Sequence, residues 1–382
     1  MSKTAGLLLP RSVVFSSIGF DIAGGFRGGL QEAGIGDVTL KTESIGLGAD
    51  DKQIYAACEK LVMEGVTIVA GYVNPTTAEK LEPLFAGGNA VFISLDAGYH
   101  FPTSMKKLLH VFYVSLQGAL CIRTLTKTAT DKGTKKIAFT CSFYDSGYRG
   151  PMAFNWGLDE GGGSITYNLI TPLKRADLTL APLATHLNSN DVDGVFAGFC
   201  GDMLQDFFKE AAAGNVLANH TVLGSSFVGE EQWLAQSPYP GVDVQVCVPW
   251  ARSLDNEANV RFTNALKKIN KTPNVFSLLG WEAGIVAAKG FEAGDTTNAI
   301  TALEGFRFES PRGQVTLDAT THQSNAPVYE AIVQRGEDGM CVLHVTGVSP
   351  ITDEQRVKLE EEINGATGTM TSWFNAYGCL DS

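Results

Sequence analysis

Short runs rich in valine, isoleucine and leucine alternate along this chain with helical patterns of ten or more residues. Such alternation is typical of βαβ units, in which crossover helices join parallel strands. It starts with the apolar run Ala5–Leu9 and continues through expected strands at Thr67–Ala70 and Val91–Leu95. The sequence therefore predicts an α/β fold built on parallel sheets.

Two helices are expected in this first region. One has an apolar residue at every fourth position from Ile18 to Leu30, which defines a single buried stripe. The other begins at Asp50, where Gln53 completes a capping box.

A second run of the same pattern starts near residue 116. The expected strands are Lys136–Cys141, Ile165–Ile170, Gly194–Ala197, Thr221–Leu223 and Val242–Val248, and the expected helices are 146–161, 175–188, 202–213 and 229–236. Asp202 and Gln205 have the spacing of a capping box at the start of one of these helices. A chain of 382 residues is long for one hydrophobic core, so we expect two α/β lobes.

Helices return after residue 255 and give way to short strands near the C-terminus. We expect an apolar helix at Val275–Phe291, strands at Gln314–Leu317, Val328–Gln334 and Met340–Val345, and a hairpin turn at 335–339. A mostly polar helix should begin at Thr352 and form a surface appendage.

Composition and charge exclude some classes of binding partner. Acidic residues exceed basic ones, with a net charge of −12, which argues against a nucleic-acid partner. No apolar run reaches the roughly 20 residues of a membrane helix, so stable membrane insertion is not expected. The N-terminus lacks the features of a signal peptide, so either the protein is cytoplasmic or its export signal has been removed.

The sequence contains none of the common motifs that mark a catalytic nucleophile, a metal site or a phosphate-binding loop. The seven cysteines show no CxxC spacing, the six histidines show no HExxH, and neither GxSxG nor GxxxxGK[ST] occurs. Gly161–Gly163 follows an expected helix, which is typical of a helix terminator. We therefore expect no cofactor and no enzymatic activity.

The loops that follow strands are the places where a ligand is expected, because free backbone N–H groups of helix N-termini lie there. In Gly71–Thr77, Asn74 suits an N-cap and Pro75 the first helical position, so Thr76 and Thr77 would face the space above the sheet. The same residues could simply start a helix.

Aromatic residues stand beside hydroxyl groups in the corresponding loops of the second lobe, an arrangement that suits an organic ligand. These aromatics are Phe143, Tyr144, Phe199 and Phe227, and each could equally pack in the core. Trp250 is a further candidate for a cleft wall, whereas Trp281 is expected in the core.

The order of these pieces resembles the type I periplasmic binding proteins, specifically the branched-chain amino-acid (Leu/Ile/Val) binding family. The matching segments run over nearly the whole chain: Leu7–Pro10, Gly19, Val69–Gly71, Phe92–Ser94, Phe112–Gly118, Ile137–Gly150, Gly198–Met203, Leu223–Gly224 and Leu279–Ala283, followed by the late hairpin.

The resemblance implies two Rossmann-like lobes joined by three crossovers near Ser115, Pro249 and Asn325. Lobe one would comprise 1–115 and 250–325, and lobe two 116–249 and 326–382 with the helical appendage. Hinge closure would trap a small-molecule ligand between them for delivery to the membrane permease of an ABC transporter. The expected location is periplasmic or extracytoplasmic.

The resemblance also implies which residues of this sequence occupy the family's ligand-binding positions. Thr76 falls where the family binds the ligand carboxylate with a hydroxyl, and Ala97 and Gly98 fall where backbone groups assist it. Ser226 falls where amino-acid binders carry the acid for the ligand ammonium, and Ile18 and Ser146 fall where they carry aromatics. The residues expected to contact the ligand are Ile18, Tyr72, Thr76, Thr77, Ala97, Gly98, Tyr144, Ser146, Phe199, Ser226 and Trp250.

An unpaired ammonium in a closed cleft would be costly to desolvate. An ordinary amino acid is therefore expected only if Asp145, Asp202 or Glu230 supplies the charge, and a small organic carboxylate, aromatic or aliphatic, is favoured. Three alternatives remain: a binder of branched-chain amino acids proper, a sensory module of the same fold, and an enzyme on two similar lobes.

Overall fold

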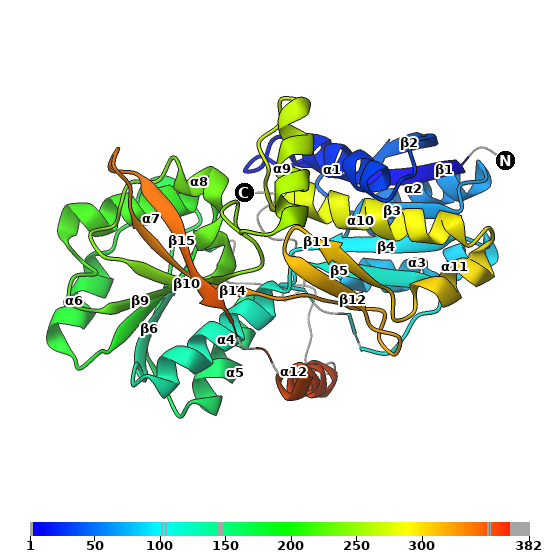
Figure 1. The fold of residues 1–382 in the computed structure, drawn as a ribbon. Helices are drawn as coiled ribbons and strands as arrows, with labels where there is room; N and C mark the ends of the chain where they lie inside the picture. The colour runs from blue at the N-terminus through cyan, green and yellow to red at the C-terminus, as the bar shows by residue number, and fades with distance from the viewer. Residues whose placement is uncertain are drawn as a thin grey trace. The chain divides into compact units, whose positions relative to one another are not determined.

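The chain forms two compact units in a computed structural model that describes residues 3–100, 102–103, 105–143, 149–349, 351 and 353–366. The chain leaves unit 1 after Leu116, returns at Leu254 and leaves again after Pro327. It returns a last time after Arg356, so helix α12 (Asp353–Ala366) is divided between the units, whereas the sequence analysis assigned all of 326–382 to the second lobe. Figure 1 shows the elements of both units.

Unit 1 contains a parallel sheet in the order β2-β1-β3-β4-β5. Its strands are β1 (Lys3–Leu9), β2 (Val38–Ser44), β3 (Ile68–Tyr72), β4 (Val91–Asp96) and β5 (Val111–Ser115). Its helices are α1 (Ile18–Glu32), α2 (Asp51–Met63), α3 (Pro75–Gly87), α9 (Glu257–Lys268), α10 (Val275–Glu292) and α11 (Thr296–Leu303). A small antiparallel sheet, β11 (Arg307–Ser310), β12 (Gly313–Leu317) and β13 (Ser324–Asn325), completes the unit.

Unit 2 contains a seven-stranded sheet in the order β15-β14-β10-β9-β8-β6-β7. The parallel strands are β6 (Lys136–Cys141), β7 (Ser164–Ile170), β8 (Gly194–Gly198), β9 (Thr221–Gly224) and β10 (Val244–Val248), and the antiparallel hairpin is β14 (Tyr329–Arg335) and β15 (Cys341–Val348). The helices are α4 (Gly118–Asp131), α5 (Arg149–Glu160), α6 (Ala181–Ser189), α7 (Gly201–Gly214) and α8 (Glu231–Leu234), with 3₁₀ turns η2 (Arg175–Asp177) and η3 (Ser226–Gly229). The predicted α/β class with two parallel sheets is confirmed.

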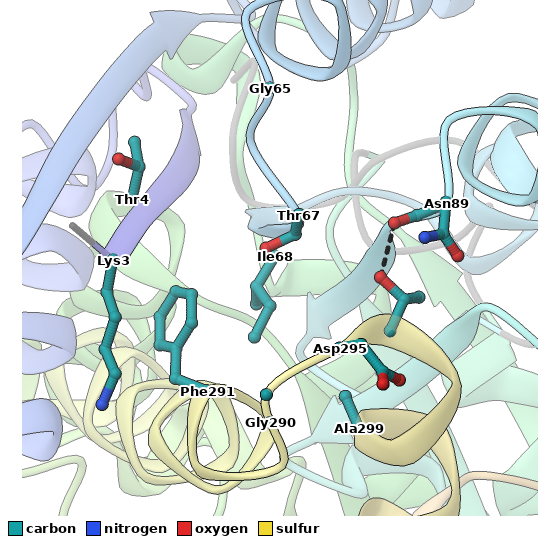
Figure 2. A pocket seen from close by; sticks show the side chains of 12 residues that line it. Lys3, Thr4, Gly65, Thr67, Ile68, Asn89, Gly290, Phe291, Asp295 and Ala299 are labelled. Atoms are coloured by element: carbon teal, nitrogen blue, oxygen red, sulfur yellow. Dashed lines mark hydrogen bonds between the residues drawn. The ribbon is translucent and has the colours of Figure 1, made fainter. Parts of the chain in front are cut away.

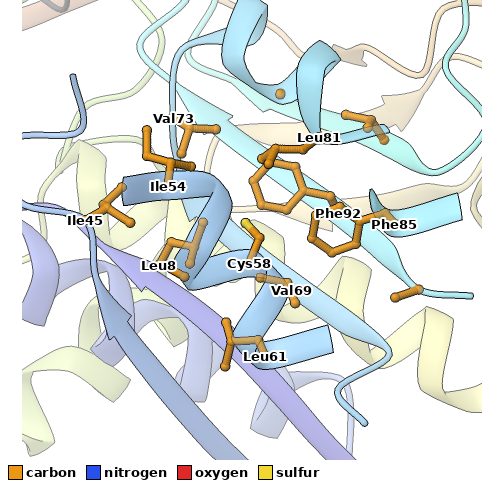
Figure 3. Close-up of a cluster of buried hydrophobic side chains, with 14 of the residues drawn as sticks. Leu8, Ile45, Ile54, Cys58, Leu61, Val69, Val73, Leu81, Phe85 and Phe92 are labelled. Carbon is orange, nitrogen blue, oxygen red and sulfur yellow. The ribbon is translucent and has the colours of Figure 1, made fainter. Parts of the chain in front are cut away.

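The core of unit 1 on one face of its sheet is a continuous apolar cluster. Figure 3 shows Leu8, Val69 and Phe92 from the strands packed together with Ile54 of α2 and Phe85 of α3. The rings of Phe85 and Phe92 lie 5.0 Å apart. Burial of side chains of this size stabilises the fold by about 1.5–3 kcal/mol each.

Helices α1 and α10 of unit 1 pack with their backbones almost in contact. A Cβ atom added to Gly29 would lie 2.0 Å from the carbonyl oxygen of Trp281, and one added to Gly280 would lie 2.2 Å from that of Ile22. Figure 1 shows the two helices side by side. Only glycine allows this approach, because any side chain would force the helices apart.

Helix starts agree with the sequence in some places and depart from it in others. Asp50 accepts hydrogen bonds from the amides of Lys52 and Gln53, as an N-cap should. The capping box predicted for Asp202 is wrong: α7 begins at Gly201, and its N-cap Cys200 makes no side-chain capping bond. Asp202 instead accepts a hydrogen bond from Arg175 at 2.6 Å.

Two predicted helices of unit 2 are shorter than expected. The segment 175–188 contains the single turn η2 and then α6, which starts at Ala181 followed by Pro182. The segment 229–236 contains only the four residues of α8, preceded by η3. Apolar periodicity predicted the buried faces, but Pro182 and the 3₁₀ turns η2 and η3 interrupt the helices themselves.

Candidate functional site: the carboxyl ends of the two parallel sheets

Each parallel sheet has one point at which its strand order reverses. In unit 1 this switch point lies between β1 and β3, and in unit 2 it lies between β6 and β8. Open α/β sheets bind ligands outside the carboxyl ends of the strands at such points. A ligand is therefore expected at the loops that follow these four strands.

Helix α3 begins directly after β3 and is capped by Asn74. The Asn74 side-chain oxygen accepts hydrogen bonds from the Thr76 amide at 3.0 Å and from the Thr76 hydroxyl at 2.9 Å. Pro75 occupies the first helical position, where no N–H is required. The predicted helix start is confirmed, and it holds Thr76 at the switch point of the sheet.

The hydroxyl of Thr77 has a different neighbour. It donates a hydrogen bond to Asp51 Oδ1 at 2.6 Å, and Asp51 is the first residue of α2. Burial alone would raise the pKa of Asp51, but the hydrogen bonds from Lys80 and Thr77 outweigh it and lower the pKa. Thr77 thus joins two helices of unit 1, and the two neighbouring threonines have different surroundings.

Asp96, the last residue of β4, is a buried acid beside the predicted residues Ala97 and Gly98. Its Oδ1 accepts hydrogen bonds from the Gly98 amide at 2.5 Å and the Ser115 hydroxyl at 2.8 Å. Burial raises the pKa of Asp96 to about 7, and these hydrogen bonds only partly oppose the shift. Gly98 has a φ of +77°, a backbone conformation that residues other than glycine rarely adopt.

Aromatic rings of unit 1 pack together near the switch point, because Phe15 lies in the loop after β1 and Tyr72 is the last residue of β3. The ring of Phe276 lies edge-on to Tyr72, with centroids 5.8 Å apart, and edge-on to Phe15 at 4.8 Å. Ile18 begins α1 and is fully buried, and its amide donates to the Phe15 carbonyl at 2.9 Å. Tyr72 and Ile18 are therefore both joined to the aromatic pair Phe15 and Phe276, Tyr72 through its ring and Ile18 through its backbone amide.

In unit 2, the predicted residues lie after three neighbouring strands. Phe199 follows β8, is fully buried, and stacks on Phe207 with centroids 4.2 Å apart. Ser226 begins η3 after β9, and Trp250 follows β10. Tyr144 and Ser146 lie outside the described residues.

The acids considered as counter-ions for an ammonium group have other contacts. Arg175 is bonded to both Asp202 and Asp206. Glu230 caps α8 by accepting the Trp233 amide at 3.1 Å, and burial raises the pKa of Glu230 to about 7. Asp145 lies outside the described residues.

A cavity of about 560 Å³ lies at the opposite edge of the unit 1 sheet. It is lined by the first residues of β1 and β3 and by the junction of α10 with α11. Figure 2 shows the ring of Phe291 between Lys3 and Ile68. None of the predicted site residues that the structure describes lines this cavity.

Neither a metal-binding cluster nor a membrane-spanning helix is found in the part of the chain that the structure describes. Within those residues, no group of three or more His, Cys, Asp or Glu side chains is placed to hold a metal ion. No helix among the same residues combines the length and apolarity needed to cross a bilayer.

Sequence reasoning missed Asp96 and its partner Ser115. A signal was present, because Asp96 directly follows the apolar run Val91–Leu95, where a charged residue must either meet solvent or find partners. Ser115 carried no comparable signal, since its hydroxyl reaches Asp96 only through the pairing of β4 with β5.

Comparisons with known proteins agree with this architecture. The family model described as periplasmic binding protein matches residues 3–338. A Leu/Ile/Val-binding protein homologue of Brucella suis is 25% identical over 347 residues, which cover 87% of this chain and 88% of the relative.

Solved structures show the same fold at lower identity. A solute-binding protein of a Rhodopseudomonas palustris ABC transporter, in complex with benzoate, has a TM-score of 0.75 and 22% identity over 93% of this chain and 99% of the other. A Leu-, Ile-, Val-, Thr- and Ala-binding protein of Brucella ovis, in its closed conformation, has a TM-score of 0.75 and 15% identity over 92% and 97%. The chain therefore belongs to the periplasmic binding protein family.

Proposed function

We propose that this chain is the substrate-binding protein of an ABC importer and that it captures a small organic carboxylate, preferably an aromatic one. The observation that carries the proposal is the Asn74-capped start of α3, which holds the Thr76 hydroxyl at the switch point of the unit 1 sheet. Family membership supports the transport role and a location outside the cytoplasm.

The chemistry of this helix start suits an anion. A helix N-terminus carries a partial positive charge, and a hydroxyl beside it can donate to a carboxylate oxygen. In the structure described here the Thr76 hydroxyl donates to Asn74, and rotation about its side chain would redirect it to a ligand. A hydrogen bond to a charged group contributes about 1.5–3 kcal/mol.

The surroundings of the acids in unit 2 favour a ligand without an ammonium group. Asp202 already pairs with Arg175, and burial raises the pKa of Glu230 to about 7, so that a large fraction of this carboxyl is protonated at neutral pH. A carboxyl that resists ionisation is a poor counter-ion. The solved neighbour that holds benzoate shows that the same fold accommodates an aromatic carboxylate.

We infer further that the ligand is held by residues of both units, so that binding favours a closed arrangement through hinge motion. The predicted contacts, Ile18, Tyr72, Thr76, Thr77, Ala97, Gly98, Tyr144, Ser146, Phe199, Ser226 and Trp250, remain the proposed set. The partner that receives the ligand is the membrane permease of the transporter. No catalytic step is proposed, because solute capture requires only binding.

A branched-chain amino acid is the second candidate ligand, and the curated Brucella relatives, named Leu/Ile/Val-binding protein homologues, favour it. It would require a counter-ion for the ammonium group from the far unit. The two candidates therefore differ in their need for an acid, which a binding screen can distinguish.

The test is a thermal-shift screen of the ligand-stripped protein with benzoate, 4-hydroxybenzoate, aliphatic carboxylates, leucine and valine. A ligand that binds the folded state raises Tm by mass action. We expect the aromatic carboxylates to give the largest shifts, and Thr76→Ala to weaken the best ligand by about 10- to 100-fold. Thr301→Ala is the matched control, because the Thr301 hydroxyl bonds only within α11. A shift with leucine and valine alone would overturn the carboxylate proposal.

A further inference from the structure

Two buried cysteines lie in contact in unit 2. Cys121 is on α4 and Cys247 is on β10, both are free thiols, and both are almost completely shielded from solvent. Helix α4 packs against β10, and the thiols of Cys121 and Cys247 on these two elements are within hydrogen-bonding reach of each other. That hydrogen bond, followed by burial, raises the pKa of Cys247 well above its ordinary value.

The backbone explains why the two thiols meet. Side chains alternate between the faces of a strand, so Cys247 points away from the face on which Val246 and Val248 lie. A Cβ atom added to Gly229 of η3 would touch both of those valines, which places η3 over their face. Cys247 therefore points to the opposite face, where its hydrogen bond to Cys121 places the first turn of α4.

The two cysteines lie near opposite ends of one long chain segment. Gln117–Ser253 is the long segment of unit 2, and Cys121 lies just after its start whereas Cys247 lies on its last strand. A bond between the two sulfur atoms would close nearly the whole segment into one covalent loop. It would also link the start of this segment, which follows Leu116, to its end, which precedes Leu254.

We propose that Cys121 and Cys247 are a disulfide-forming pair, and that the protein acquires this cross-link when it folds in the presence of a disulfide oxidant. One thiolate attacks a sulfur atom of the oxidant and forms a mixed disulfide. The second thiolate then attacks the cysteine sulfur of that mixed disulfide and displaces the remaining half of the oxidant. The two cysteines lose two protons and two electrons, and the oxidant is reduced to two thiols.

The expected consequence is a more stable unit 2. A disulfide that closes a long loop restricts the unfolded chain and typically stabilises a protein by lowering its entropy. For a loop of this length we expect oxidation to raise Tm by about 5–15 °C. Because both thiols are buried, the bond should form during folding rather than on the folded protein.

The sequence allows a direct test by peptide mapping. Trypsin should release Leu108–Arg123, whose single cysteine is Cys121, and Glu210–Arg252, whose single cysteine is Cys247. The full chain is unfolded and refolded with a mixture of reduced and oxidised glutathione, and a second sample is refolded with reductant alone. Remaining thiols are then blocked and both samples are digested without reduction.

We expect the two peptides to be linked in the oxidised sample and separate in the reduced sample. The absence of that linked species, or a link from either peptide to a different cysteine in its place, would overturn the proposal. This readout uses the unmodified protein, so it does not depend on whether a variant folds.

A pair of variants tests the stability change. Cys247→Ala should reduce the Tm difference between oxidised and reduced samples by about 5–15 °C relative to the unmodified chain. Cys58→Ala is the matched control, because Cys58 is an equally buried thiol within the apolar cluster of unit 1. An undiminished difference in Cys247→Ala, or an equal reduction in Cys58→Ala, would contradict the assignment.

Discussion

Glu282 of α10 and Arg312 of the β11–β12 turn form a two-point ion pair that is completely buried. Arg312 Nε donates to Glu282 Oε1 and Nη2 donates to Oε2, each at 2.7 Å. The Ser310 hydroxyl donates to the same Oε1 at 2.6 Å. The pair ties the small antiparallel sheet of unit 1 to the helix that covers its main sheet.

Loss of one member of this pair should be strongly destabilising. Glu282→Ala leaves the guanidinium buried without its carboxylate, so we expect the free energy of unfolding to fall by about 3–5 kcal/mol. The double variant Glu282→Ala/Arg312→Met should lose less than the sum of the single losses. Urea unfolding measures these free energies. Arg261→Ala is the control, because its partner Glu32 is near the surface, and it should lower the free energy of unfolding by under about 1 kcal/mol. A small loss for Glu282→Ala would show that the pair is dispensable.

Close packing of α1 against α10 leads to a second prediction. Gly29→Ala would place a methyl group 2.0 Å from the Trp281 carbonyl oxygen, so the helices must separate. We expect a loss of at least about 2 kcal/mol in the free energy of unfolding. Gly87→Ala in α3 is the control, because its Cβ meets nothing within 4 Å, and alanine should stabilise that helix by up to about 1 kcal/mol. Equal effects at the two positions would refute the packing argument.

Asp96 should make stability depend on pH in the neutral range. Burial raises the pKa of Asp96 from 3.8 to about 7. Its contribution to stability is therefore fully present below about pH 4 and is lost as the pH rises through about 7. Asp96→Asn keeps an oxygen acceptor but cannot ionise, so its stability relative to the unmodified chain should rise between pH 5 and pH 8.

Urea unfolding at the two pH values measures the effect of Asp96→Asn. Asp131→Asn, at an exposed position of α4, is the control and should show the same difference at both values. If the Asp96→Asn difference is also constant, Asp96 does not titrate in this range.

His322 should produce the opposite dependence on pH. Its ring stacks on Phe112 with centroids 3.9 Å apart, and burial lowers its pKa from 6.5 despite the nearby Glu304. The stability that neutral His322 contributes is present above about pH 6.5 and is lost as the pH falls. His322→Asn, which tolerates the φ of +58°, should lose less stability between pH 7 and pH 5 than the unmodified chain.

Thermal unfolding across this pH range measures the His322 effect. His344→Asn, at an exposed position of β15, is the control and should retain the acid sensitivity of the unmodified chain. Equal acid sensitivity in His322→Asn would assign the loss to other groups.

Much of the architecture could be predicted because it depends on local patterns. Alternating apolar runs predicted the two parallel sheets, and the Asn74–Pro75 pair predicted the start of α3. Both signals lie within a few residues of the structure that they specify.

Features that join distant segments could not be predicted in the same way. Glu282 and Arg312 meet only after the small sheet has packed on α10, and the pairing of Thr77 with Asp51 depends on how α2 and α3 lie together. Asp202 had the sequence of an N-cap, but Arg175 from the preceding segment binds it instead. Periodicity predicts which face is buried, and it does not identify the partner on the other side.

The central claim is that this chain binds a small organic carboxylate through the start of α3. Calorimetric titration of the ligand-stripped protein with benzoate and with leucine, repeated on Thr76→Ala, tests it most directly. The account predicts that benzoate binds, that Thr76→Ala weakens it by about 10- to 100-fold, and that leucine binds far more weakly. Tight binding of leucine without binding of benzoate, or benzoate binding unchanged by Thr76→Ala, would contradict it.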